Sequence, residues 1–207
     1  MRIGRACIIY FYDHFRGCHQ AGYSHIADTI SELFSPGAPN KALLDPLHTL
    51  YALLLVLFGI GILRYIQEYE QARRMGTAGA ALYIAMGLLS LTSATVFPQD
   101  AWGSAPTFPG QLHIFVHGVI SIISLISILL IGIWFGRVER LTWFRTYSFI
   151  TLGLAILSAG FFMANMGSPI MGLTERIAGL IGFLWTFTLA LRILRRNHTA
   201  QKQAVYP

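Results

Sequence analysis

Five long runs of apolar residues constrain the fold of this chain more than any other feature does. They cover residues 46–63, 76–97, 112–136, 146–166 and 172–194. Each run is about the 20 residues that a membrane-spanning helix requires. Apolar residues follow one another continuously, without the strict alternation of a membrane β-strand. The sequence therefore predicts an all-α, polytopic transmembrane helix bundle with five spans.

The composition excludes the soluble classes of protein. Only 12% of the 207 residues are charged and 55% are hydrophobic, whereas about 25% of residues in soluble proteins are charged. A soluble enzyme and a disordered chain are therefore excluded. Cys7 and Cys18 are the only cysteines, which excludes a secreted disulfide scaffold and a thiolate metal site.

The basic residues predict how the chain is oriented in the membrane. Ten of the 15 fall between the first and second runs, between the third and fourth runs, or at the end of the fifth run and beyond it: Arg64, Arg73, Arg74, Arg137, Arg140, Arg145, Arg192, Arg195, Arg196 and Lys202. The alternate loops, residues 98–111 and 167–174, contain none. By the positive-inside rule, the C-terminus and a tail over residues 197–207 are cytoplasmic, and the alternate loops lie outside. Because topology explains the net charge of +6, no nucleic-acid partner is expected.

The first 21 residues differ from the rest of the chain. Their apolar run, residues 6–12, is too short to cross a bilayer. No small-residue cleavage site of a signal peptide follows it. We expect residues 1–21 to be an atypical N-terminus without a clear span, on the surface or disordered, followed by one membrane-embedded domain over residues 22–196.

Residues 24–34 have the pattern of a short amphipathic helix on the outer surface. Apolar side chains recur on one face, and Pro36 and Gly37 end the segment. The opposite face carries three polar residues, His25, Asp28 and Glu32. The pattern fits either a plain interfacial helix or a site in which the two carboxylates hold a cation or an arginine.

A histidine pair begins the third run. His113 and His117 are four residues apart, so a helix places both imidazoles on one face. Together with Asp100 from the preceding loop, they have the residue types of a zinc site with water as the fourth ligand. Proton exchange and a purely structural role are the alternatives. We expect both histidines to face the bundle interior, and without a metal at least one of them should bond to Asp100 or Glu32.

Glu175 and Arg176 open the fifth run, where Arg176 is a candidate partner for Glu32 or Asp100; the alternative is an ordinary interfacial helix end. Burial of charge requires close partners, so we expect Glu32, Asp100, His113 and Arg176 to meet in one polar pocket. The candidate binding residues are His25, Asp28, Ser31, Glu32, Asp100, Glu175 and Arg176.

The glycine, serine and threonine residues inside the apolar runs are expected to have structural roles. Glycines allow close contacts between helices, and we expect such contacts at Gly153, Gly160, Gly179 and Gly182. Serine and threonine hydroxyls inside spans are expected to bond to their own helix backbone rather than to line a transport path.

Several motifs occur together in one order. They are Gly22-Tyr23-Ser24, Thr29-Ile30-Ser31-Glu32, Pro36-Gly37-Ala38-Pro39-Asn40, Phe97-Pro98-x-Asp100, His113-x-x-x-His117 and Glu175-Arg176-Ile177. This combination, over about residues 22–196, resembles a mostly bacterial and archaeal membrane family catalogued as domain of unknown function 998. The resemblance implies a membrane location and no particular activity, and we expect the chain in the cytoplasmic (plasma) membrane. The family usually has six spans; the first is missing here, and Phe34 and Ser35 depart from its usual small residues.

Two classes of function remain. In the first, which we favour, a non-catalytic membrane protein binds a lipid headgroup, a cation or a proton at its outer polar cluster. The alternative is a zinc-dependent hydrolase acting on a lipid, because Ser31, Asp100, His113 and His117 are similar in kind to residues of ceramidase-like membrane hydrolases. A third histidine of that pattern is missing, so His25 would have to replace it. Zinc is thus the candidate cofactor, and the lipid bilayer is the expected partner.

Overall fold

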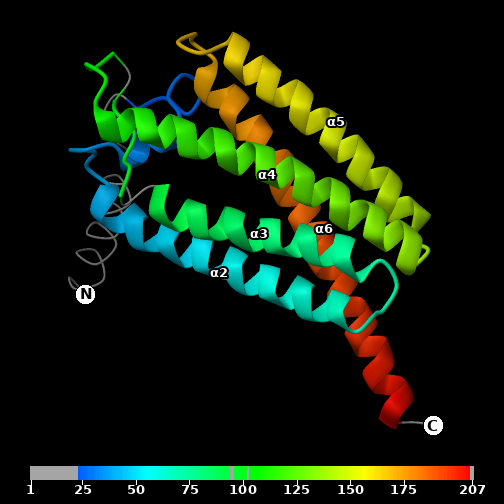
Figure 1. The fold of residues 1–207 in the computed structure, drawn as a ribbon. Helices are drawn as coiled ribbons and strands as arrows, with labels where there is room; N and C mark the ends of the chain where they lie inside the picture. Colours follow the sequence, from blue (N-terminus) through cyan, green and yellow to red (C-terminus); the bar gives the residue numbers. More distant parts are fainter. Residues whose placement is uncertain (1–22, 94–95, 102, 206–207) are drawn as a thin grey trace, which may run out of the picture.

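The computed structural model describes residues 23–93, 96–101 and 103–205, with side-chain environments up to residue 196. It contains five long helices, α2 (Lys41–Gln67), α3 (Arg73–Ser93), α4 (Phe108–Val138), α5 (Thr142–Ala164) and α6 (Met171–Val205). All five are long and apolar enough to cross a membrane, and the described residues contain no strand. The predicted all-α bundle with five spans is therefore confirmed (Figure 1). The predictions for residues 1–21 lie outside the described residues.

Successive helices run in opposite directions and pack against their neighbours in sequence. Helices α2, α3, α4 and α5 lie side by side in that order, and α6 passes behind α4 and α3 (Figure 1). Large side chains connect α6 to the more distant helices: the Tyr83 and Thr186 hydroxyls are 3.1 Å apart, and the Tyr51 ring contacts that of Phe183. The C-terminal part of α6 projects beyond the other helices, into the predicted tail.

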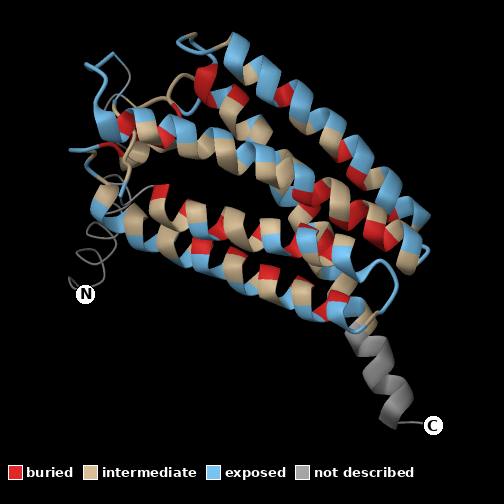
Figure 2. Ribbon diagram, in the orientation of Figure 1, coloured by how far each residue is buried: buried red, intermediate tan, exposed pale blue. Residues whose placement is uncertain are grey.

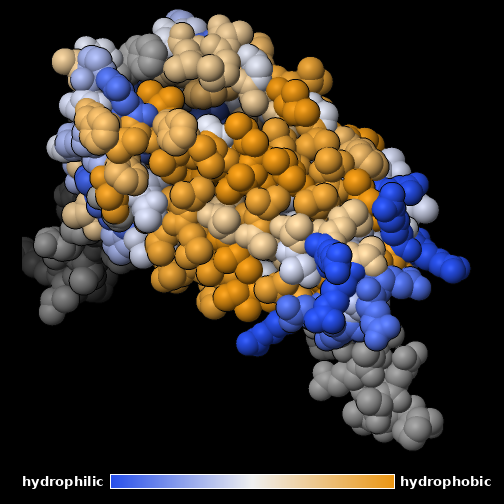
Figure 3. All heavy atoms as spheres, in the orientation of Figure 1, coloured by the Kyte–Doolittle hydropathy of each residue, from blue (hydrophilic) through white to orange (hydrophobic). Residues whose placement is uncertain are grey.

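Buried residues follow the inner faces of the helices (Figure 2). Exposed apolar residues occur on all five long helices and form a broad belt on the face that Figure 3 shows. The largest fully buried side chains include Trp134, Trp185, Phe135 and Phe144. The belt has the apolar surface that lipid requires, because hydrocarbon offers no hydrogen bonds to polar groups. The arrangement therefore supports an integral membrane protein.

The bundle has two chemically different ends. The polar end consists of residues 23–40, 96–101, 103–107 and 165–170, and the basic end consists of residues 64–74, 137–145 and 192–196. Most of the arginines that predicted the cytoplasmic side gather at the basic end (Figure 3). Which side of the membrane this end faces stays a prediction.

Close contacts between helices occur at glycines of α2, α3 and α4. A Cβ atom at Gly79 would lie 2.9 Å from Ile131, and one at Gly132 would lie 2.5 Å from Ser148. The contacts that we expected in α5 and α6 are wrong. Gly153, Gly160 and Gly182 face open space, and near Gly179 only Phe183 of its own helix lies within 4 Å. These glycine faces of α5 and α6 therefore have no other helix against them.

The predicted amphipathic helix over residues 24–34 is a turn at residues 25–27 followed by the short 3₁₀ helix η1 (Ser31–Phe34). The Ser24 N–H donates to the Asp28 carboxylate at 2.6 Å, and the Thr29 N–H donates to the Glu32 carboxylate at 2.7 Å. Side-chain acceptors that bond to nearby backbone N–H groups compete with helix formation. The residues that we placed on a polar helix face thus fold the segment into turns.

Candidate functional site

The segment over residues 23–32 lies on the N-terminus of α6. The Gly172 and Leu173 N–H groups donate to the carbonyl oxygens of Ala27 and Ile26, at 3.1 and 2.9 Å. These N–H groups belong to the first turn of α6, which has no intrahelical partners for them. A Cβ atom on Gly172 would lie 2.0 Å from the Asp28 carbonyl oxygen, so this close approach requires glycine.

Arg176, on the next turn of α6, holds the same segment from the side. One of its terminal nitrogens donates to the carbonyl oxygens of Asp28 and Gly172, both at 2.9 Å. The other donates to the Tyr23 hydroxyl at 2.5 Å and lies 3.4 Å from His25 Nδ1. The sequence analysis expected a carboxylate of Glu32 or Asp100 as partner. The guanidinium instead bonds to main-chain carbonyls and a phenol.

The Tyr23 hydroxyl completes this connection. Burial raises its pKa above the usual value, although Arg176 acts in the opposite direction. The neutral phenol donates to the Thr29 carbonyl oxygen at 2.8 Å while it accepts from Arg176. Tyr23 therefore links Arg176 of α6 to Thr29, two residues before η1.

Two glutamates fix the η1 region. The Glu32 carboxylate accepts from the N–H and hydroxyl of Thr29 at 2.7 and 3.0 Å, and the Glu32 N–H donates back to that hydroxyl at 3.3 Å. This reciprocal pair is a capping box. The Glu175 carboxylate accepts from the Ile30 N–H at 2.5 Å and from the Ser31 hydroxyl. Both carboxylates thus act on the fold of the segment.

Asp100 is bound to the residue that caps α4. Its two carboxylate oxygens accept from the N–H and the hydroxyl of Thr107, both at 2.7 Å. These hydrogen bonds lower the pKa of Asp100 below its usual value. A Cβ atom on Gly110 would lie 2.0 Å from Asp100 Oδ2, so glycine makes room for the carboxylate.

His113 is buried, with 4% of its surface exposed, which confirms its predicted inward position. Its Nδ1 lies 2.7 Å from the Phe97 carbonyl oxygen and 3.3 Å from that of Ser93. Carbonyls only accept, so Nδ1 carries the hydrogen, and in the neutral imidazole Nε2 then carries a lone pair. His113 Nε2 is buried and has no hydrogen-bond partner among the described residues. The rings of His113 and His117 are stacked, with centroids 4.3 Å apart.

A third histidine, His48, lies near this pair and was not among the predicted site residues. Its Nε2 donates to the Ser90 carbonyl oxygen at 2.9 Å, and it interacts electrostatically with both His113 and His117. A signal was present in the sequence. His48 and His113 each occupy an early turn of a span, and alternate spans run in the same direction, which places both at one membrane level.

The expected single pocket is divided among local partners. Arg176 bonds to the 23–28 segment, Asp100 bonds to Thr107, and His113 bonds to main-chain carbonyls of the α3 end. Gln99, which precedes Asp100, connects the Asp100 loop to the 23–32 segment, because its side-chain amide lies 3.4 Å from the Thr29 hydroxyl. Within the described residues, no group of three or more His, Cys, Asp or Glu side chains is arranged to hold a metal ion.

A charged cluster at the basic end was also missed. The Glu139 carboxylate accepts from Arg192 at 2.6 Å, from Arg196 at 2.9 Å and from the hydroxyls of Tyr65 and Tyr69. Its side chain is only 4% exposed. The Arg196 guanidinium also lies over both tyrosine rings. A signal was Arg192, a charge inside the last apolar run, because such charges require a partner.

Residues 6–192 match the protein family described as protein of unknown function (DUF998). The chain belongs to this family. The matched range begins before Gly22, so it extends into the segment that we treated as atypical. Neither the curated proteins nor the solved structures gave a match to the chain. Membership supports a membrane protein and carries no named activity.

Proposed function

We propose that this chain is a non-catalytic integral membrane protein that binds a cation at its polar end, with His113 and His117 as the receptor. The observation that carries the proposal is the buried His113 Nε2, which has a lone pair and no hydrogen-bond partner among the described residues. A buried acceptor left unpaired costs about 1–3 kcal/mol. A bound cation would accept this lone pair.

The surroundings of His113 suit that role. Ligating histidines usually donate their second ring nitrogen to a carbonyl or carboxylate, which fixes the tautomer and the ring orientation. His113 Nδ1 is held in this way by the Phe97 carbonyl oxygen. His117 adds a second imidazole against the first ring, and Asp100 interacts electrostatically with His113. One acidic side chain and two imidazoles favour a cation over an anion.

The other two interpretations have less support. A lipid headgroup would need a cationic donor at this end, and the terminal nitrogens of Arg176 are occupied by Tyr23 and two carbonyl oxygens. A zinc hydrolase would need a third ligand and an available Ser31. The Ser31 hydroxyl donates to Glu175, and the described residues bring no third ligand to the pair.

Zinc titration of the purified, detergent-solubilised chain tests the proposal. Isothermal titration calorimetry with Zn²⁺ at neutral pH should show one ion per chain, with binding lost in His117→Ala. Acidification should weaken binding, because protons compete for the same nitrogen lone pairs.

His25→Ala is the matched control, since His25 is exposed at the same end and contacts Arg176 and Tyr23. It should bind zinc as the parent does. Absence of zinc binding to the folded parent, or full binding by His117→Ala, would overturn the proposal.

A further inference from the structure

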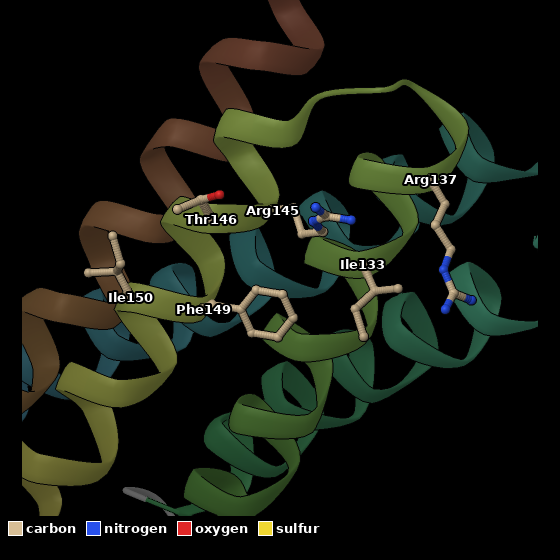
Figure 4. Close-up of a pocket in the computed structure, with 6 residues that line it drawn as sticks. All are labelled: Ile133, Arg137, Arg145, Thr146, Phe149 and Ile150. Carbon is tan, nitrogen blue, oxygen red and sulfur yellow. The ribbon is translucent and has the colours of Figure 1, made fainter.

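A groove lies between α4 and α5 at the basic end, far from the histidine pair. It encloses about 530 Å³ and is lined by Ile133, Arg137, Arg145, Thr146, Phe149 and Ile150 (Figure 4). Its two arginines come from different helices of one hairpin. Basic residues thus combine with an apolar wall in one surface hollow.

The guanidinium groups of this groove are not used by the fold. Arg137 and Arg145 are exposed, and neither forms a hydrogen bond or an ion pair with any residue that the structure describes. The nearest acidic residue in sequence is Glu139, and its carboxylate is occupied by Arg192 and Arg196. Two positive charges at the groove therefore lack an anionic partner among the described residues.

The position of Arg145 is nevertheless defined. A Cβ atom on Gly136 would lie 2.6 Å from Arg145 Cδ and 2.8 Å from its Cβ. The stem of Arg145 therefore lies directly on the α4 backbone, in the space that Gly136 leaves. Four residues earlier, Gly132 receives Ser148 in the same way, so the two helices are held closely together below the guanidinium.

The apolar wall of the groove continues into the lipid-facing belt. Phe149 and Ile150 are 47% and 57% exposed and lie one turn further along α5 than Arg145. Trp143, in the first turn of α5, is 52% exposed, and exposed tryptophans are enriched at the level of the headgroups. The groove therefore runs from headgroup level toward the hydrocarbon.

We propose that this groove binds one anionic phospholipid, with the phosphate between Arg137 and Arg145 and an acyl chain along Ile133, Phe149 and Ile150. Arginine donates to phosphate oxygens in a bidentate fork, and the Thr146 hydroxyl is a further donor at the groove. Basic pockets between spanning helices bind anionic headgroups on the cytoplasmic side. The basic end is the end predicted to face that side, and this site is independent of the proposed histidine site.

Native mass spectrometry of the full chain in detergent tests the assignment. With added phosphatidylglycerol, the protein should carry one retained lipid, and with phosphatidylcholine it should retain at least about tenfold less. Arg137→Gln/Arg145→Gln should lose the retained lipid. The control Arg73→Gln/Arg74→Gln removes the same charge from two exposed arginines at the same end and should retain it.

Two further arms separate a lipid from a simple anion. Ile150→Trp adds bulk to the apolar wall of the groove, and it should weaken retention of phosphatidylglycerol while the net charge is unchanged. Inorganic phosphate at millimolar concentration should not displace the lipid. Equal retention of the two lipids, equal loss in both double variants, or full displacement by phosphate would each overturn the proposal.

Discussion

The two ends of the bundle use their charged side chains in different ways. At the polar end, charges bond to the main chain: Arg176 donates to the Asp28 carbonyl oxygen, and Asp100 accepts from the Thr107 N–H. At the basic end, Glu139 bonds to the side chains of two arginines and two tyrosines, while Arg137 and Arg145 have no hydrogen-bond or ion-pair partner among the residues that the structure describes. Charges at the polar end therefore shape loops, whereas the basic end carries positive charge that the fold does not use.

Removing the charge of Glu139 should have the largest effect on stability. Glu139→Gln keeps the shape of the side chain but leaves Arg192 and Arg196 without their counter-charge. Removal of one partner from a buried ion pair costs about 3–5 kcal/mol, and the partial exposure of both arginines reduces the expected loss to roughly 3 kcal/mol. Equilibrium unfolding in mixed micelles measures it.

Glu68→Gln is the control for this variant, because Glu68 is an exposed glutamate at the same end. Its effect should stay within about 0.5 kcal/mol. If the two variants unfold alike, the Glu139 cluster does not stabilise the basic end.

Gly172→Ala should disturb the polar end to a smaller extent. The new methyl group would lie 2.0 Å from the Asp28 carbonyl oxygen, and a main-chain atom cannot rotate away. The 23–32 segment must then shift from α6, at a cost of about 2 kcal/mol. A lowered thermal unfolding midpoint in detergent is the expected result.

Gly182→Ala is a matched control on the same helix, since no atom lies within 4 Å of the added carbon. Alanine has the higher helix propensity, so this variant should be at least as stable as the parent. A Gly172→Ala protein as stable as Gly182→Ala would show that the segment does not need its close contact with α6.

The spans and the separation of polar and basic ends could be predicted from the sequence. Span location depends on hydropathy summed over about 20 residues, so errors at single residues have little effect. The inward position of His113 followed from the cost of an imidazole facing hydrocarbon, and its burial confirms the expectation. These features depend on residue type and approximate position alone.

Contacts between particular groups could not be predicted in the same way. Lipid-facing and protein-facing sides of a span are both apolar, so the sequence pattern did not show that Gly153 faces open space while Gly132 receives Ser148. Most partners at the polar end are main-chain groups, such as the Asp28 carbonyl oxygen for Arg176 and the Thr107 N–H for Asp100. Every residue has a carbonyl, so residue types do not indicate which one is bound.

The smallest expected effect concerns Asp100, and it tests whether the polar end uses this charge on its own loop. Asp100→Asn keeps the side chain's size beside Gly110 but removes the charge that accepts from Thr107. The pKa of Asp100 is lower in the folded protein than its ordinary value of 3.8. The ionised group therefore stabilises the fold fully above that ordinary value, and the contribution is lost as the pH falls through the lowered pKa. The thermal midpoint of Asp100→Asn should lie slightly below that of the parent at pH 6, and the difference should shrink on acidification below pH of about 4.

Thr107→Val provides the cross-check, because it removes one of the two donors. In that background Asp100→Asn should have a smaller effect, since residues in one hydrogen-bonded network are not additive. An undiminished effect would mean that Asp100 acts through a group other than Thr107. The Asp100 carboxylate would then be a candidate ligand for the histidine site rather than a loop contact.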